Sequence, residues 1–110
     1  MPARDLELHP EALEDALAGY AWYLERSVRV ADGFLAELER AIVLIRTDPE
    51  RWPSYRFGTR HYVLRKYPYS VVYGLRGDSI VIYAFAHGKR KPGYWKDRLE
   101  SRGPARRGRP

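Results

Sequence analysis

The segment FAHGKRKPGYW, residues 85–95, gathers side chains that could do chemistry at the end of an apolar run. Its histidine, His87, titrates nearest neutrality and could act as an acid or a base. Its cations could neutralise a phosphate, and its aromatic rings could stack on a base. These cations and rings are Lys89, Arg90, Lys91, Tyr94 and Trp95. We therefore expect a catalytic or binding surface in this segment.

The upstream segment RHYVLRK, residues 60–66, offers further polar groups. In an extended strand alternate residues share a face, so His61 and Arg65 would project together, with Arg60 beside them as a further binding cation. Together with the later loop they predict a basic concavity edged by aromatic rings. Such a surface suits a phosphate-bearing ligand, and it suits an acidic peptide laid across the sheet equally well.

Each of these residues also has a purely structural interpretation. His61 and Arg65 could be solvated sheet residues, and His87 could hydrogen-bond the turn that follows it. Tyr94 and Trp95 could anchor a closing helix to the core. The cations could belong to an ordinary soluble loop.

Other kinds of site find no support. The histidines His9, His61 and His87 lack metal-ligand spacing, and the chain has no cysteine. No glycine-rich phosphate loop and no G-x-S-x-G motif is present. We therefore predict neither a metal nor a cofactor.

Charge is distributed unevenly along the chain. Residues 1–55 carry six Lys and Arg against eleven Asp and Glu, whereas residues 56–91 carry eight against one. Residues 92–110 carry six against two. A basic C-terminal half of this kind attracts polyanions or acidic protein segments.

Two helices and an antiparallel meander are predicted to position these groups. Leu13, Leu17, Tyr20 and Leu24 recur at helical spacing and predict a helix over 10–26, begun by Pro10. A second apolar set predicts a helix over 29–47, ended before a proline, and the two should form a hairpin that covers a sheet.

The sheet should come from three segments rich in β-branched and aromatic residues, 60–66, 69–76 and 79–87. Both faces of the last segment are apolar, so we expect it to be central and covered on both sides. In it Ile80, Ile82, Ala84 and Ala86 should share one face. Residues 4–8 could add an edge strand, and residues 92–99 could form a short closing helix.

Residues 1–99 are expected to form one domain, and residues 100–110 read as a disordered basic tail. The first residues are acidic and interrupted by prolines, and no apolar run is long enough for a span. These features indicate no signal peptide and no membrane contact, and they favour the cytoplasm.

In their joint order these segments resemble the RelE/ParE superfamily of bacterial toxins from type II toxin–antitoxin modules. The similarity covers about residues 4–99. It rests on the hairpin containing GFLAELERAIVLI, on the R-x-Y-V-x-R and PYSVVY strands, and on the H-x-x-R-x-P-x-Y-W end. The fold implied is α+β, with an N-terminal two-helix hairpin packed on a three- to four-stranded antiparallel sheet and a short C-terminal helix.

The resemblance implies a growth-inhibiting toxin that forms a hetero-oligomer with a cognate antitoxin. Two activities occur in the superfamily. ParE-like members bind and poison DNA gyrase, whereas RelE-like members cut messenger RNA on the ribosome through the RNA 2′-hydroxyl. Gyrase is favoured here, with the endoribonuclease as the alternative and a non-toxic nucleic-acid-binding domain as a second alternative. The antitoxin segment should be acidic and amphipathic, because the basic half otherwise lacks counter-charge.

For a ribonuclease, the catalytic candidates are Arg90, Arg65, His61, His87 and Tyr94. By the resemblance, Arg90 matches a nuclease arginine in position, and Tyr94 lies near a nuclease tyrosine. Ser70 stands where those nucleases carry a further arginine, and their strand lysines fall at His61 and Val63. Arg90 is thus the clear match among the catalytic cations, which favours the gyrase branch.

Overall fold

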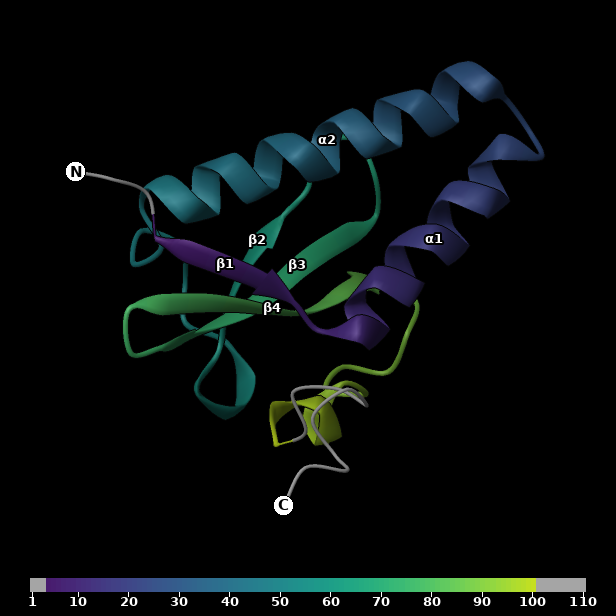
Figure 1. Ribbon diagram of the computed structural model, residues 1–110. Coiled ribbons are helices and arrows are strands. Elements are labelled where there is room, and N and C mark those ends of the chain that lie inside the picture. The colour runs from purple at the N-terminus through teal and green to yellow at the C-terminus, as the bar shows by residue number, and fades with distance from the viewer. Residues whose placement is uncertain (1–3, 101–110) are drawn as a thin grey trace.

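The computed structural model describes residues 4–100 and shows two helices lying against one face of a four-stranded sheet (Figure 1). Short 3-10 turns occur at Arg56–Gly58 and Lys96–Leu99. The strands and helices, in chain order, are β1 (Asp5–Leu8), α1 (Pro10–Leu24), α2 (Val28–Thr47), β2 (Arg60–Val63), β3 (Tyr69–Arg76) and β4 (Ser79–His87). The predicted α+β class is confirmed, and the closing helix is a single 3-10 turn.

The strand order in the sheet is β1-β4-β3-β2. Strands β2, β3 and β4 form the predicted antiparallel meander. The edge strand β1 instead runs parallel to β4, with Asp5 opposite Ser79 and Leu8 opposite Ile82, so the sheet is mixed rather than wholly antiparallel. The parallel direction brings the chain from β1 straight to the start of α1, where the His9 N–H donates to the Ile82 carbonyl at 2.9 Å.

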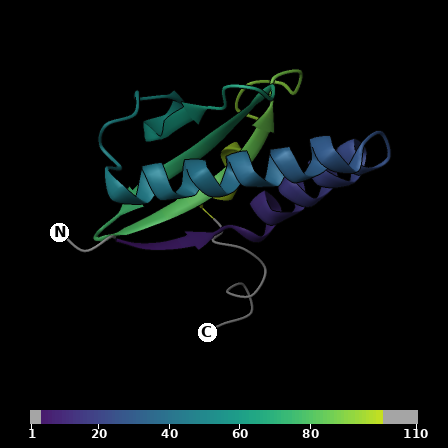
Figure 2. The same cartoon turned by 90° about the horizontal axis from the view of Figure 1, so that it is seen from above.

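Both helices begin at residues that satisfy their first free N–H groups. At α1 the Nδ1 of His9 accepts a hydrogen bond from the Glu11 N–H at 3.1 Å, and Pro10 follows as the first helical residue. At α2 the Ser27 hydroxyl accepts from the Val30 N–H at 3.2 Å. The helices meet at this turn in both views (Figure 2), as the predicted hairpin requires.

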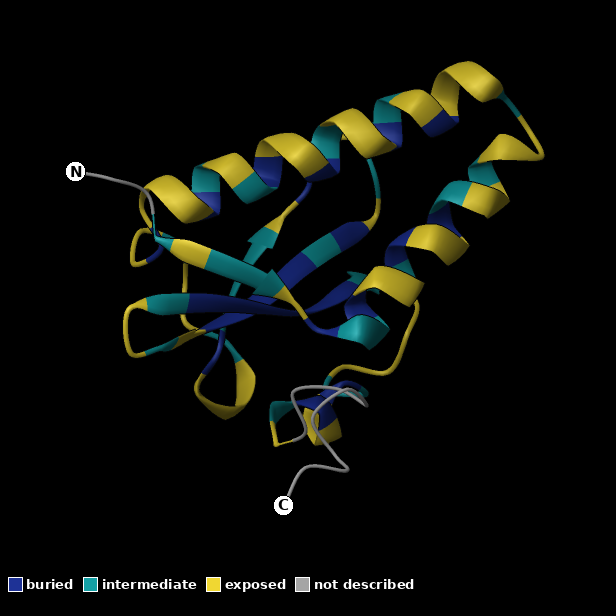
Figure 3. Cartoon of the chain, viewed as in Figure 1, coloured by how far each residue is buried: buried dark blue, intermediate teal, exposed yellow. Residues whose placement is uncertain are grey.

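Of the apolar stripe predicted to bury α1, Tyr20 and the supporting Ala16 pack in the core, whereas the leucines face outward. Leu13, Leu17 and Leu24 are 48%, 58% and 41% exposed. Instead the buried positions of α1 are small residues, Ala12 and Ala16 together with a glycine (Figure 3). Periodicity alone cannot separate these faces, because small and large apolar residues both recur at helical spacing along α1.

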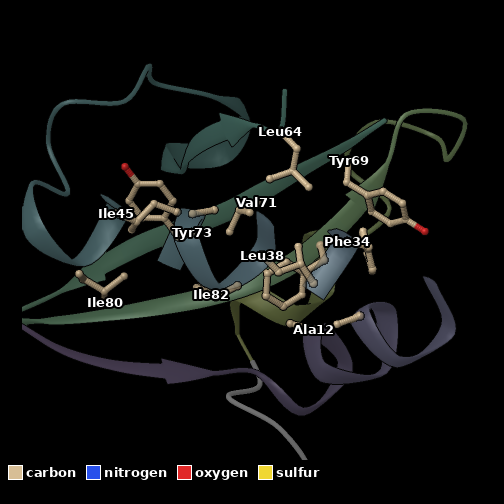
Figure 4. Packing of buried hydrophobic residues seen from close by; sticks show 13 residues of the cluster. Ala12, Phe34, Leu38, Ile45, Leu64, Tyr69, Val71, Tyr73, Ile80 and Ile82 are labelled. Atoms are coloured by element: carbon tan, nitrogen blue, oxygen red, sulfur yellow. The ribbon is translucent and has the colours of Figure 1, made fainter. Parts of the chain in front are cut away.

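Small residues face inward on α1 because the helix lies very close to the core. A Cβ on Gly19 would come within 2.7 Å of the Tyr69 hydroxyl and 3.0 Å of the Phe34 ring. The bulk of the core therefore comes from α2 and the strands. Phe34, Leu38 and Ile45 of α2 pack on the strand residues in Figure 4.

Strand β4 is central and is covered on both faces, as predicted. A register shift lies between Val72 and Tyr73, which oppose Ala84 and Ile82, so Tyr83 is an extra residue in β4. The bulge reverses the alternation of faces. Ile80 and Ile82 pack under the helices together with Phe85, whereas Ala84 and Ala86 pack on the other face against Trp95, so the predicted grouping of the isoleucines with these alanines is wrong.

The C-terminal segment closes the helix-free face of the sheet. Trp95 is only 1% exposed and packs with Val72 and Ala84. The predicted basic tail lies almost wholly outside the described residues.

The burial of Phe34 and the exposure of Leu17 predict losses of stability of very different size on truncation. Phe34→Ala should lower the free energy of unfolding by about 3–5 kcal/mol, because it leaves a cavity in the core. Leu17→Ala, on the exposed stripe, should lower it by less than about 0.5 kcal/mol. Urea unfolding followed by circular dichroism measures both, and equal losses would contradict the assignment.

Candidate functional site

The outer edge of β4 is completed by two side chains from distant segments. Pairing with β1 ends at Ile82, and β4 continues beyond it. There the Phe85 N–H donates to an Asp15 carboxylate oxygen at 3.1 Å, and an Arg98 Nη1 donates to the Tyr83 carbonyl at 2.9 Å. The edge groups of the strand therefore keep hydrogen-bond partners without a neighbouring strand.

The two side chains also form a two-contact ion pair with each other. Nη1 of Arg98 lies 2.7 Å from one Asp15 oxygen, and Nη2 lies 3.3 Å from the other. Both side chains are about 10% exposed, at 10% for Arg98 and 9% for Asp15. Glu11, one turn earlier on α1, adds a weaker contact to Nε of Arg98 at 3.6 Å. The pair joins α1 to the C-terminal segment across β4.

Tyr94 is the third member of this cluster. Its hydroxyl donates to the same Asp15 oxygen at 3.1 Å. Burial, and next the negative charge of Asp15, raise the pKa of Tyr94 to about 12. Arg90 lies over the Tyr94 ring, with its guanidinium carbon 3.8 Å from the ring centre. Tyr94 thus fixes the position of a loop cation.

A groove of about 920 Å³ opens beside this cluster, between α1 and the end of β4. Five of its fifteen lining residues are aromatic, the loop side contributes Lys89 and Arg90, and α1 contributes the acidic residues Glu14 and Asp15. The aromatic lining residues are Trp22 and Tyr23 of α1, Tyr69 and Phe85 of the sheet, and Tyr94. Aromatic walls with a few charged groups at the rim are typical of binding sites.

The groove brings together four of the predicted site residues, His87, Lys89, Arg90 and Tyr94. His87 meets Tyr69 edge-on, with ring centres 4.9 Å apart, and its Nδ1 accepts the Lys89 N–H at 3.0 Å. This last contact is the turn hydrogen bond expected of His87 on the structural interpretation. The same group therefore shapes the loop and lines the groove.

Other predicted site residues lie away from the groove. The His61 ring stacks on Tyr55 at 3.9 Å, and burial lowers the pKa of His61. Arg60 donates to the carbonyls of Glu50 and Trp52 at 3.0 and 2.5 Å, which fastens the loop before β2.

Three further predicted residues also stay outside the groove lining. Arg65 is exposed in the turn after β2. Lys91 and Trp95 line a smaller hollow of about 80 Å³ on the helix-free face, which adjoins the groove because His87, Arg90 and Tyr94 line both. The Trp95 ring is buried there, so it contributes packing and little accessible surface.

Sequence reasoning missed the Asp15–Arg98 pair. From the sequence, Asp15 is interpreted as an acidic residue that favours the positive end of the helix dipole of α1. Arg98 is interpreted as part of a basic C-terminal segment. The partners are 83 positions apart, so no local pattern joins them. The only available signal is that Asp15 interrupts the apolar and small residues of α1, which hints at a partner.

Comparisons with known proteins identify the class to which this fold and groove belong. A family model described as "ParE toxin of type II toxin-antitoxin system, parDE" matches residues 6–92. The chain therefore belongs to the ParE toxin family of type II toxin–antitoxin systems. A search of the proteins with curated descriptions finds no match.

Among solved structures, the chain is similar to one titled "Chromosomal ParDE TA system from P. aeruginosa". The TM-score is 0.69 at 19% identity, over 77% of this chain and 96% of that chain. This likeness supports the fold. Within residues 4–100, no helix is long and apolar enough to cross a membrane, and no three acidic or histidine side chains are grouped to hold a metal ion.

Removing one member of the buried pair of Asp15 and Arg98 should lower the free energy of unfolding substantially. Asp15→Asn leaves Arg98 without its counter-charge and should lower the free energy of unfolding by about 3 kcal/mol or more. The matched control is Glu11→Gln, which removes a half-exposed carboxylate from the same arginine and should cost less than about 1 kcal/mol. Urea unfolding at neutral pH compares the two, and similar losses would contradict the role given to Asp15.

The phenol of Tyr94 should ionise late. With a folded pKa of about 12 against 10 when unfolded, the folded state keeps the proton that the unfolded state loses. Its contribution to stability is therefore complete below pH 10 and is lost as the pH rises through about 12. Ultraviolet titration should show a late component, shared with Tyr73 at about 12, that shrinks in Tyr94→Phe. An unchanged late component in that variant would contradict the assignment.

Proposed function

We propose that this ParE-family toxin inhibits DNA gyrase by binding it and cleaves no RNA. We propose further that the cognate antitoxin neutralises it by inserting an acidic amphipathic segment into the groove beside α1. The protein would act in the cytoplasm, where gyrase works. The hydrogen bond from Tyr94 to Asp15 carries the proposal, because it occupies the hydroxyl of a residue that is one of the catalytic candidates for a ribonuclease.

The acid–base groups support binding rather than cleavage. A general acid or base works best with a pKa near the operating pH, whereas Tyr94 has a pKa of about 12 and donates to a carboxylate. His61 is stacked on Tyr55, and its Nδ1 is buried without a hydrogen-bond partner. Of the catalytic candidates, Tyr94 and His61 are therefore already engaged in contacts within the fold.

The cations support the same conclusion. Phosphate cleavage needs several cations converging on one phosphate. Here Arg98 is paired with Asp15 and Arg60 is bonded to backbone carbonyls. The groove retains Lys89 and Arg90 at its rim, a number that suits salt bridges to a protein partner.

The groove supports the antitoxin part of the proposal. Its aromatic walls can take apolar side chains of a peptide, and Lys89 and Arg90 can pair with that peptide's carboxylates. The exposed leucines lie on α1, the helix that lines the groove, and they would extend the apolar contact with the peptide. A segment that is both apolar and acidic meets both features.

The test is a pair of assays on the same preparation. With purified gyrase and relaxed plasmid, the toxin should inhibit supercoiling, while transcripts in cells that express it should stay intact. Arg90→Ala should raise the concentration needed for inhibition about tenfold, because it removes a cation of the proposed binding surface. Arg40→Ala, an exposed arginine on α2, is the matched control and should leave inhibition unchanged.

Reproducible cuts within transcripts, lost in Arg90→Ala, would overturn the proposal in favour of the ribonuclease. Adding the antitoxin segment should restore supercoiling in proportion to its occupancy of the toxin.

A further inference from the structure

Two neighbouring loops, residues 54–60 and 91–96, form a surface on the helix-free side of the sheet. Their contact is close, because a Cβ on Gly93 would lie 3.1 Å from the Phe57 ring. The Phe57 ring also meets Trp95 edge-on, with ring centres 5.9 Å apart. We define the two-loop surface by its exposed members, Arg56, Phe57, Lys91 and Lys96.

Phe57 is held in an unusual position. It is 51% exposed and has φ 59°, and within residues 4–100 it is the only residue other than glycine with positive φ. Bulky side chains adopt this left-handed conformation rarely and at an energetic cost. A ring half in water recovers little of that cost by burial. Strain that folding does not require is a feature of functional positions.

Two cations adjoin the Phe57 ring, one in space and one along the chain. The Lys96 ammonium lies 5.0 Å from the Phe57 ring centre, and Arg56 is its chain neighbour. Within the described part of the chain, no ion pair involves Arg56, Lys91 or Lys96. Residues 56–91 contain a single acidic residue. The two-loop surface therefore combines an exposed ring with cations that form no ion pair within the described residues, although the exposed Asp97 follows Lys96 in the chain.

The surface is also preorganised. The Tyr55 N–H donates to the Thr59 carbonyl at 2.8 Å, and the Thr59 hydroxyl donates to the Arg56 carbonyl at 2.6 Å. The Tyr55 ring stacks on His61 of β2, which ties the loop to the sheet. A ligand would thus find the ring and its neighbouring charges already in place, at a small cost in ordering.

We propose that the two-loop surface binds a single strand of nucleic acid. A base stacks on Phe57, and the adjoining phosphates pair with Arg56, Lys91 and Lys96. A single strand of nucleic acid alternates flat bases with negatively charged phosphates. These match the exposed ring and the cations of the two-loop surface, because proteins that bind single strands combine aromatic stacking with a basic track. A purely acidic peptide such as poly-glutamate would pair with the cations but would leave the Phe57 ring without a partner. The proposal goes beyond gyrase inhibition and does not depend on it.

The test titrates the full-length protein into fluorescently labelled oligo(dT) and oligo(rU), each about 12 nucleotides long, and measures fluorescence anisotropy. We expect binding with Kd of about 1–100 µM that weakens as salt rises. Phe57→Asn keeps a residue that tolerates positive φ but removes the ring, and it should weaken binding about tenfold. Phe57→Trp should retain binding. Preference between the two oligonucleotides distinguishes DNA from RNA as the source of the strand.

Charge reversal supplies the matched control. Lys96→Glu should weaken binding at least as much as Phe57→Asn, whereas Arg40→Glu on α2 makes the same change in net charge and should leave binding nearly unchanged. The arginines of residues 102–109 are present in every variant, so their background is constant. Circular dichroism confirms that each variant is folded.

Three results would overturn the proposal. The first is binding unaffected by Phe57→Asn, and the second is equal loss in Lys96→Glu and Arg40→Glu. The third is an acidic peptide, poly-glutamate of equal charge, that competes as well as the oligonucleotides do. Because no gyrase is present in this assay, its failure leaves the supercoiling test untouched.

Discussion

The buried pair of Asp15 and Arg98 is the contact on which the rest of this structure depends. Strand β4 is longer than its neighbour β1, so the edge of β4 from Tyr83 onward would otherwise have unpaired backbone groups in a region covered by α1. Side chains from α1 and from the C-terminal segment take the place of a strand there. Two charges buried together are tolerated because they pair with each other and each makes further hydrogen bonds, Asp15 to Phe85 and Tyr94 and Arg98 to Tyr83.

The groove and the two-loop surface both follow from this contact. Because Arg98 holds the C-terminal segment across β4, Tyr94 is directed toward α1 and Trp95 toward the helix-free face. Tyr94 and Arg90 then form one wall of the groove, and Trp95 supports Phe57 on the other side. One short segment thus builds two surfaces of different chemistry, one mainly aromatic and one strongly basic.

Local patterns predicted the elements of this fold well. Helix starts at Pro10 and near Ser27 follow from capping chemistry, and the strands follow from runs of β-branched and aromatic residues. The loop at residues 87–90 could be predicted as a site, because its residue types are unusual after a buried strand. These signals lie within a few positions along the chain.

Features set by tertiary contact could not be predicted in the same way. The bulge at Tyr83 changes which side chains of β4 share a face, and no residue type in that part of the strand predicts a bulge. The inward face of α1 is decided by how closely Gly19 approaches Tyr69. The position of His61 depends on Tyr55, which belongs to a loop rather than to the sheet. Each of these features depends on contacts between residues far apart in the sequence, which a periodic pattern over a few turns or strand residues does not detect.

Amide hydrogen exchange in Arg98→Gln tests most directly whether the pair holds α1, β4 and the C-terminal segment together. The account predicts that protection falls at the Phe85 amide and through residues 94–99, while the amides of α2 and of the β3–β4 pairing before the bulge keep theirs. Unchanged protection at Phe85, or a uniform loss over the whole chain, would contradict it.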